Sequence, residues 1–192
     1  MRQKCEIILA SASPRREELL SRLPCTFTVR AADVDETVPD ETPPRRAVME
    51  LARRKARAVF CPGGHAAVIG ADTLVSLGGK LLGKPGSKER AYEMLRTLSG
   101  RRHQVSTGVC VVLPSGVCIT FCSAAEVTFR ALTDEEIYAY IATGEPLDRA
   151  GAYAIQGGAA PFVKAYRGDY DGIVGLPVRR LGTLLARLGV LC

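Results

Sequence analysis

Two adjacent arginines, Arg15 and Arg16, stand in what the sequence predicts to be the first turn of a helix. Ser13 is a favoured N-cap residue and Pro14 suits the first helical position, so the helix is expected to begin here. Unpaired backbone N–H groups make this end of a helix partly positive, and each cation placed there costs ~0.3–1 kcal/mol. The arrangement therefore predicts that an anion binds beside the two arginines.

Lys55 and Asp72 are charged residues at positions where the sequence predicts burial. Lys55 lies at helical spacing from Val48 and Leu51, which places it on their inward-facing stripe. Asp72 interrupts the apolar run AAVIGADTLV, which is typical of a strand covered on both faces, and a carboxylate buried there needs a partner or a metal. A lysine at the edge of the core and an aspartate that ends a strand are the structural alternatives.

The segment GGKLLGK, residues 78 to 84, has the spacing of a phosphate-binding loop, G-x-x-x-x-G-K. Pro85 follows it, whereas that motif requires serine or threonine at this position. We therefore expect Gly78 and Gly79 to form a tight hairpin turn instead. Lys84, between glycine and proline, is either a cation on a stiff loop or a solvated lysine.

Carboxylates and an amide complete the candidate chemistry. Asp33, Asp35 and Glu36 end a β-like stretch over residues 26–37, and they are either a solvated turn or part of a metal site. Hard divalent cations that bridge phosphates are held by one or two carboxylates. Gln156, flanked by Ile155 and two glycines, can read the edge of a nucleotide base or pin a turn, because its amide both donates and accepts.

The composition limits the class of protein. The 192 residues fit one domain over residues 1–192, and 47% hydrophobic with 24% charged residues is usual for a globular protein. No apolar run reaches the ~18 residues that span a bilayer, and the N-terminus lacks a signal-peptide layout. We therefore expect a cytoplasmic protein with no membrane partner.

The net charge of +6 fits a nucleic-acid surface or a pocket for a small polyanion. A nucleic-acid-binding or division-regulating protein would use the basic face between Arg45 and Arg57. Aromatic residues make up only 6% of the chain and tryptophan is absent, so a base-stacking surface is unsupported. Nucleic acid is the less favoured partner.

Cysteine and histidine suggest no metal framework. We expect the cysteines to be reduced and hydrophobic, because their number is odd and no pair has C-x-x-C spacing: Cys5, Cys25, Cys61, Cys110, Cys118, Cys122 and Cys192. His65 and His103 are the two histidines, too few for a histidine-rich metal site. The chemistry must rest on carboxylates, lysines and arginines.

Strands and helices alternate along the chain, which predicts a mixed α/β architecture. Helices are expected over residues 44–60, after a Ser87 cap, after a capping box at 133–136, and at the C-terminus with Leu181, Leu184, Leu185 and Leu188 facing inward. Two long β runs, 104–113 and 116–129, are expected to form a hairpin.

Seven segments, in this order, carry a resemblance to a known family: LASASPRREELL, LARRKA, GADTLV, GKP, LSGRRHQVSTGV, EPLDRAGAYAIQG and GDYDGIVGLPV. From Ile8 to about Val178 the chain resembles the Maf family of nucleoside triphosphate pyrophosphatases. The resemblance implies an α/β fold related to that of inosine triphosphate pyrophosphatases, with a mixed twisted sheet flanked by helices and two lobes around a central cleft.

The resemblance also implies an activity. Maf proteins cleave a nucleotide between its α and β phosphates, with a divalent cation (Mg²⁺, Mn²⁺ or Co²⁺), often as homodimers. The combination of A-D-T with I-Q-G is similar to the subfamily that acts on dTTP and UTP. The same reaction on another or modified nucleotide, such as 7-methyl-GTP, is the alternative.

Residue by residue, Asp72 matches the family's catalytic proton acceptor. The family's other active-site charges match Arg16, Glu36, Lys55 and Lys84. The positions that set substrate choice match Arg15, Thr73 and Gln156, and Ser11 is expected among the substrate-binding residues. Glu36 and Asp72 are expected to hold the metal. Arg149 stands where the family usually has lysine, and Ala154 where glycine is common, so a role for Arg149 carries over least directly.

Overall fold

The computed structural model describes residues 3–39 and 41–191. Its centre is a seven-stranded mixed sheet with the order β2-β1-β3-β5-β6-β7, and β4 pairs with β3 beside this path. The strands are β1 (Glu6–Ala10), β2 (Thr28–Val29), β3 (Ala66–Leu77), β4 (Lys80–Leu82), β5 (Arg102–Val112), β6 (Cys118–Phe129) and β7 (Val163–Arg167). β1 runs parallel to β2 and β3, and the other pairs are antiparallel. The predicted mixed α/β architecture is confirmed.

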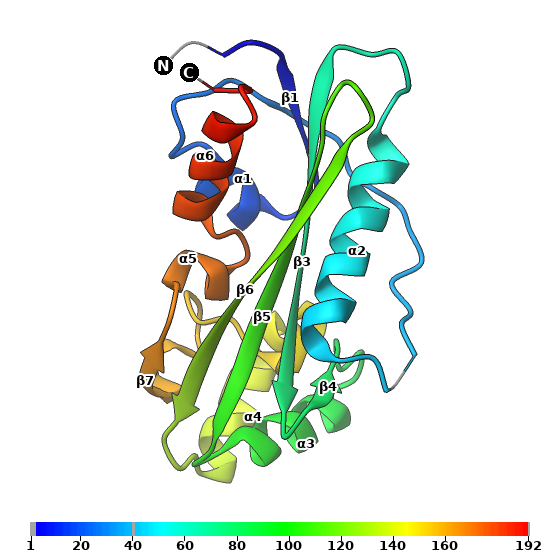
Figure 1. Ribbon diagram of the computed structural model, residues 1–192. Helices are drawn as coiled ribbons and strands as arrows, with labels where there is room; N and C mark the ends of the chain where they lie inside the picture. The colour runs from blue at the N-terminus through cyan, green and yellow to red at the C-terminus, as the bar shows by residue number, and fades with distance from the viewer. Residues whose placement is uncertain (1–2, 40, 192) are drawn as a thin grey trace.

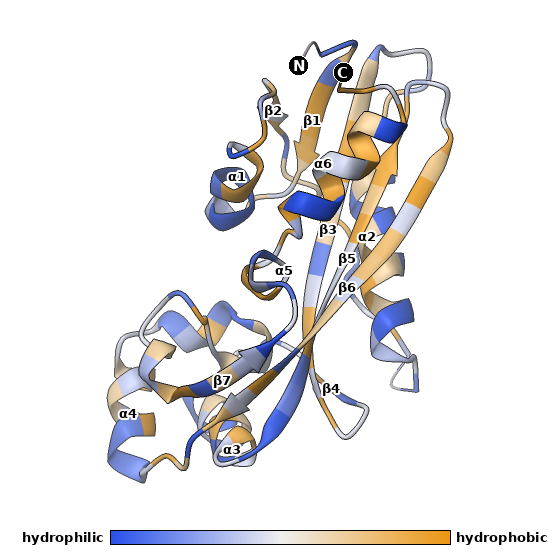
Figure 2. Cartoon of the chain, turned by 60° about the vertical axis from the view of Figure 1, so that its left-hand side comes forward, coloured by the Kyte–Doolittle hydropathy of each residue, from blue (hydrophilic) through white to orange (hydrophobic). Residues whose placement is uncertain are grey.

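Helices cover both faces of this sheet, and the long strands β3, β5 and β6 run between two groups of them (Figures 1 and 2). One group lies near the N- and C-termini: α1 (Pro14–Leu20), α5 (Tyr170–Val174) and α6 (Val178–Arg187). The other lies at the far end of the strands: α3 (Lys88–Leu98), α4 (Asp134–Ala142) and the 3-10 turns η1 (Glu145–Asp148), η2 (Ala150–Ala152) and η3 (Ala160–Phe162). Across the described residues, no helix combines the length and the apolar character needed to cross a membrane.

Helix α2 (Pro44–Val59) lies alone on the opposite face, against β3 and β5. Two strand glycines make its close approach possible. A Cβ atom on Gly70 would lie 2.3 Å from the carbonyl oxygen of Ala52, and one on Gly108 would lie 2.2 Å from that of Val48. Because no side chain separates helix and sheet here, a residue on the inner face of α2 reaches β3 directly. Lys55 is such a residue, and it is 8% exposed.

Most local predictions are confirmed. Leu77 pairs with Lys80 across Gly78 and Gly79, which both have positive φ, as a tight hairpin requires. The β5–β6 hairpin forms, and Thr133 and Glu136 make the capping box of α4. The cysteines Cys5, Cys25, Cys61, Cys110, Cys118 and Cys122 are free, while Cys192 lies outside the described residues.

Two local predictions are wrong in part. Within residues 26–37 only Thr28–Val29 is strand, because the chain leaves the edge of the sheet and runs toward α2. The Ser13 side chain makes no capping bond; its own backbone N–H donates to Ser11 Oγ instead. The predicted inward face of the last helix is confirmed: Leu181 and Leu185 are fully buried, and Leu184 and Leu188 are partly buried and pack against the same core.

Candidate active site

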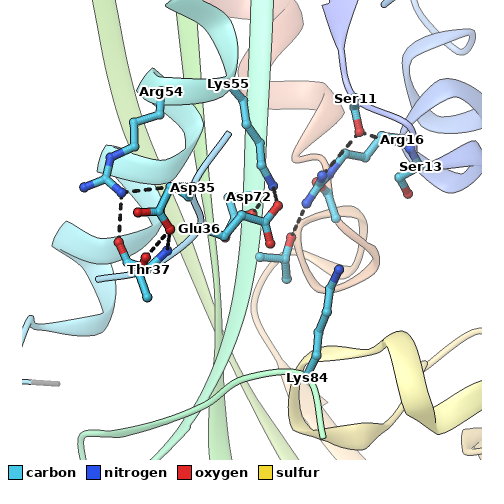
Figure 3. Close-up of polar contacts among 12 residues, drawn as sticks. Ser11, Ser13, Arg16, Asp35, Glu36, Thr37, Arg54, Lys55, Asp72 and Lys84 are labelled. Atoms are coloured by element: carbon cyan, nitrogen blue, oxygen red, sulfur yellow. Dashed lines mark hydrogen bonds and ion pairs between the residues drawn. The ribbon is translucent and has the colours of Figure 1, made fainter. Parts of the chain in front are cut away.

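A cleft of about 640 Å³ opens between the two groups of helices, beside β3. Its lining includes every residue that the sequence analysis placed in the site: Ser11, Arg15, Arg16, Glu36, Lys55, Asp72, Thr73, Lys84 and Gln156. They come from α1, α2, β3 and four separate loops. Figure 3 shows the side chains of Lys55, Arg16 and Lys84 converging on the region around Asp72 from three directions. The roles assigned to these residues stay predictions, but their shared position is a fact of the structure.

Lys55 joins the two carboxylates of the cleft. Its Nζ donates to Asp72 Oδ1 at 2.6 Å and lies 2.6 Å from Glu36 Oε1 (Figure 3). Asp72 is 6% exposed, so the lysine supplies the partner that a buried carboxylate needs. Burial raises the pKa of Glu36, but the hydrogen bond and charge of Lys55 outweigh it, and this pKa lies below its ordinary value. Glu36 is therefore available as an anion near neutral pH.

Arg16 is held by three hydrogen bonds around its guanidinium group. Its Nε donates to Gly175 O at 3.1 Å, and its two Nη atoms donate to Ser11 Oγ and Thr73 Oγ1 at 3.3 Å each. Burial lowers the pKa of Arg16 while Asp72 and Glu36 oppose this effect, and an arginine keeps its proton in any case. Helix α1 has only seven residues. The predicted anion site therefore depends on this fixed side chain more than on the end of the helix.

A chain of hydroxyl groups runs from Arg16 into the core. Thr107, fully buried on β5, donates its proton to Gly172 O at 2.7 Å. Its oxygen lies 2.8 Å from Thr73 Oγ1 and must accept there, because a hydroxyl has one proton to give. Thr73 consequently donates its own proton to Thr107, so its oxygen can only accept hydrogen bonds in the cleft. One of its lone pairs accepts the bond from Arg16.

Further cations line the same cleft. Lys84 Nζ pairs with Asp148 Oδ1 at 2.9 Å, and that bond raises the pKa of the lysine. Burial, with the charges of Arg149 and Arg16, lowers the pKa of Arg15. The Nε atoms of Arg15 and Arg149 are buried without a hydrogen-bond partner among the described residues. Cations crowded in this way, with donors still unsatisfied, are suited to a polyanionic ligand.

Comparison with known proteins identifies the family. The family model described as "Maf-like protein" matches residues 6–188. A protein of Moorella thermoacetica named dTTP/UTP pyrophosphatase is 51% identical over 186 residues, covering 96% of each chain. A protein of Thermococcus kodakarensis with the same name is 51% identical over 175 residues, covering 90% of this chain and 91% of the relative.

This chain belongs to the Maf family. Its fold is also similar to that of a HAM1 protein from Coxiella burnetii, with a TM-score of 0.53 and 17% identity over 96% of this chain and 100% of the other. At that identity the likeness concerns the fold alone. It agrees with the mixed sheet flanked by helices that the Maf resemblance implied.

The carboxylates in the cleft of this Maf protein fit a divalent cation that takes only some of its ligands from the protein. Glu36 and Asp72 offer hard carboxylate oxygens beside one another, on either side of Lys55 Nζ. Within residues 3–39 and 41–191 no cluster of three or more potential metal ligands forms. A cation held here would take its remaining ligands from water and substrate phosphates, as Mg²⁺ commonly does, and carboxylate with water also suits Mn²⁺.

Of the acidic stretch, only Glu36 turns into the cleft of the Maf fold. The Asp35 carboxylate accepts hydrogen bonds from the backbone N–H and hydroxyl of Thr37, and Arg54 donates to the Asp35 and Thr37 carbonyl oxygens (Figure 3). Asp35 therefore builds the turn that aims Glu36. Asp33 is exposed and does not line the cleft.

Sequence reasoning missed several supporting residues of the Maf site. Thr107 and Asp148 touch Thr73 and Lys84, but neither stands out in the sequence. Thr107 looks like an ordinary strand residue. Its one detectable signal is a hydroxyl within the long apolar run of β5, which needs a partner once it is buried.

Proposed function

We propose that this Maf-family protein hydrolyses nucleoside triphosphates, with dTTP and UTP as its substrates, to the nucleoside monophosphate and pyrophosphate. The observation that carries the proposal is the convergence of Lys55, Lys84 and Arg16 on one cleft beside the carboxyl groups of Asp72 and Glu36. Relatives about half identical to this chain bear the name dTTP/UTP pyrophosphatase, which supports the same substrates here.

The reaction is attack of water on the α-phosphorus, with the bond from that phosphorus to the bridging oxygen breaking. Asp72 holds and orients the water. Its Oδ1 is engaged by Lys55, whereas Oδ2 has no hydrogen-bond partner among the described residues and can accept the water's proton. The pyrophosphate leaves with the electron pair of the broken bond. Lys55 thus fixes the carboxylate so that one oxygen faces the substrate.

The cations lower the barrier by neutralising the charge of the triphosphate. In phosphoryl transfer the protein mainly positions groups and stabilises charge, so lysines and arginines matter more than a nucleophilic side chain. Lys84 and Arg16 approach the cleft from different directions and would contact phosphate oxygens (Figure 3). A divalent cation bound by Glu36 and Asp72 would add further positive charge at the same phosphates.

The choice of base depends on another part of the cleft lining, the turn that carries Gln156. Gln156 is exposed, lines the cleft, and makes no side-chain hydrogen bond to a described residue, so its amide is free for a ligand. Uracil and thymine share an N3–H donor between two carbonyl oxygens, and a single amide can both accept from the former and donate to one of the latter. A homodimer and a cytoplasmic location stay predictions from the sequence.

The test is hydrolysis of dTTP, UTP, CTP and 7-methyl-GTP measured side by side with Mg²⁺ or Mn²⁺, following pyrophosphate and monophosphate together. We expect dTTP and UTP to exceed the other two in kcat/KM by at least about tenfold, the discrimination available from one paired polar contact. A higher kcat/KM for CTP or 7-methyl-GTP would show that this nucleotide, and not dTTP or UTP, is the substrate. Hydrolysis of none, with salt-dependent micromolar binding to DNA or RNA, would favour the nucleic-acid alternative.

A further inference from the structure

The loop that carries Gln156, here called the Gln156 loop and defined as residues 154–158, is turn rather than helix or strand. Its own backbone contributes one bond, from Gly157 N to Ala154 O at 3.0 Å. One such bond leaves the position of the loop relative to the cleft undetermined. Ile155 packs into the core at 7% exposed, and side chains outside the loop supply the further contacts that place the Gln156 amide.

Two side chains hold the ends of this loop. The Tyr140 hydroxyl, on α4, accepts from Ala154 N at 3.2 Å. The Glu145 carboxylate, in η1, accepts through Oε2 from Gly158 N at 2.8 Å. The two bonds therefore anchor the residues on either side of Gln156 to one rigid element pair. Tyr140 is 4% exposed and packs against Phe162, so its own position is set by the core.

The two glycines after Gln156 confirm how closely the loop lies on these side chains. A Cβ atom on Gly157 would stand 1.8 Å from Glu145 Oε1, where no atom fits. A Cβ atom on Gly158 would stand 3.0 Å from two ring carbons of Tyr140. Neither glycine has the positive φ that would demand glycine on backbone grounds. A side chain at either position would push the loop and its neighbour apart, because the loop backbone rests directly against the carboxylate and the phenol ring.

The contact at Glu145 is short, with 2.8 Å between Gly158 N and Glu145 Oε2. The Glu145 carboxylate also lies near enough to Arg15 to raise the pKa of that guanidinium, against the effect of burial. Glu145 therefore stands between the loop and a cation of the cleft without lining the cleft itself.

We propose that Tyr140 and Glu145 are positioning residues that set nucleotide choice, because they hold the Gln156 loop in the position from which the Gln156 amide can form hydrogen bonds with the nucleotide base. The proposal rests on the proposed function. It assigns to α4 and η1, which carry none of the reacting groups, control over which nucleotide enters. Loosening either bond is expected to weaken substrate recognition while the reacting groups around Asp72 remain in place.

The principal experiment compares Glu145→Ala with Glu145→Gln. We expect Glu145→Ala to raise KM for UTP about tenfold with kcat within about twofold, and to reduce the UTP-to-CTP preference by a similar factor. Glu145→Gln keeps an oxygen that accepts from Gly158 N, so its KM should stay within about threefold of the wild type. Should Glu145→Gln behave like Glu145→Ala, the charge facing Arg15 would be the cause and the proposal would be overturned.

A second pair separates the hydroxyl from general effects on α4. Tyr140→Phe removes the acceptor for Ala154 N, and we expect a KM rise of about threefold to tenfold with a reduced UTP-to-CTP preference. The matched control is Tyr138→Phe on the same helix, where the ring is exposed and its hydroxyl makes no hydrogen bond to a described residue. Equal KM values for the two variants would contradict the proposal.

Two further measurements keep the result interpretable. Gly157→Ala leaves both side chains intact but forces the loop away from Glu145, so it should reproduce the KM rise even if Glu145→Ala folds poorly.

Amide hydrogen exchange of residues 154–158 in the ligand-free protein should quicken about tenfold in Glu145→Ala and stay unchanged in the surface control Glu93→Gln. Hydrogen exchange tests the loop contacts independently of activity. If the wild type hydrolyses neither dTTP nor UTP, the proposed function is contradicted, but the loop contacts can still be tested. Faster exchange with unchanged nucleotide preference would overturn the role in specificity.

Discussion

Two parts of the cleft lining differ in what carries their polar groups. In one part, here called the reaction end, Lys55 and Asp72 stand on the long helix α2 and the long strand β3 and bond to each other at 2.6 Å. In the other part, here called the recognition end, Gln156 stands on a turn that two outside side chains hold. The difference indicates that the chemistry is built into the sheet, while the choice of base depends on a separable loop.

Burial follows the same division. Lys55 is 8% and Asp72 6% exposed, whereas Gln156 is exposed. Ion pairs removed from water are screened little, so the reaction end has strong and fixed electrostatics. A solvated amide has weaker contacts but can be repositioned by its loop. Substitutions at the reaction end should therefore act on kcat, and substitutions at the recognition end on KM.

The largest effect is expected from Lys55→Met, which keeps most of the length of the side chain and removes its charge. Asp72 then loses the donor that fixes its Oδ1, and kcat for dTTP should fall by about 10³-fold. The measurement is steady-state kinetics with Mg²⁺. Arg57→Met, an exposed change on the same helix, serves as the control. If Lys55→Met instead raises KM and leaves kcat unchanged, Lys55 acts in substrate recognition, and the division between the two ends is contradicted.

The same variant also probes the proposed cation site. Without Lys55, Glu36 and Asp72 repel each other, and a divalent cation can relieve that repulsion. Added Mg²⁺ or Mn²⁺ should therefore raise the Tm of Lys55→Met more than that of the wild type. Equal shifts in the two proteins would argue against these carboxylates as metal ligands.

A stability effect is expected from His103, which supports the recognition end from beneath through a 2.8 Å hydrogen bond to Tyr153. Burial lowers the pKa of His103 from 6.5 to about 4 in the folded protein. The unfolded chain binds a proton first as the pH falls, so folding loses stability between pH 6.5 and 4, by about 3 kcal/mol in all. Above pH 6.5 this contribution is fully present.

Denaturant unfolding measured from pH 7 to pH 4 tests this. His103→Gln should flatten the pH dependence in that window, whereas the exposed variant His65→Gln should keep it. A His103→Gln protein with the wild-type slope would mean that other groups cause the loss. At neutral pH we expect His103→Gln to have the kcat of the wild type. That result would show that His103 supports the recognition end and takes no part in the reaction.

The smallest effect is expected from Thr107→Val, which removes the acceptor for the Thr73 proton. Thr73 is then free to turn its hydroxyl away from Arg16, and kcat/KM should fall about tenfold, the cost of one misaligned hydrogen bond. Thr107→Ser keeps the hydroxyl and should restore most of the activity. The exposed strand variant Thr120→Val is the control. Wild-type kinetics in Thr107→Val would show that Arg16 needs no such support.

The sequence predicted the reaction end better than the recognition end, and the reason is periodicity. Lys55 on an apolar helical stripe and Asp72 in an apolar strand are detectable because a buried charge breaks a regular pattern. Their pairing also follows from the strand glycines, since Gly70 and Gly108 let α2 lie directly on the sheet. The nearly complete confirmation of the hairpins and the capping box has the same origin in short-range patterns.

The contacts that organise the recognition end could not be predicted in this way. The bond from Gly158 to Glu145 and that from Ala154 to Tyr140 link segments through a turn with no repeating pattern. The restriction of strand over residues 26–37 to Thr28–Val29 is a related failure. β propensity was present there, but the neighbouring strand β1 ends at Ala10 and leaves later residues without a partner.

The most direct test of the account is Asp72→Asn, assayed for turnover of dTTP and for binding of a dTTP analogue whose α and β phosphorus atoms are joined by a methylene group. Asparagine still accepts from Lys55 but is a far weaker proton acceptor. The account predicts that kcat falls by about 10³-fold while the Kd of the analogue changes little. Turnover at the wild-type rate would contradict it.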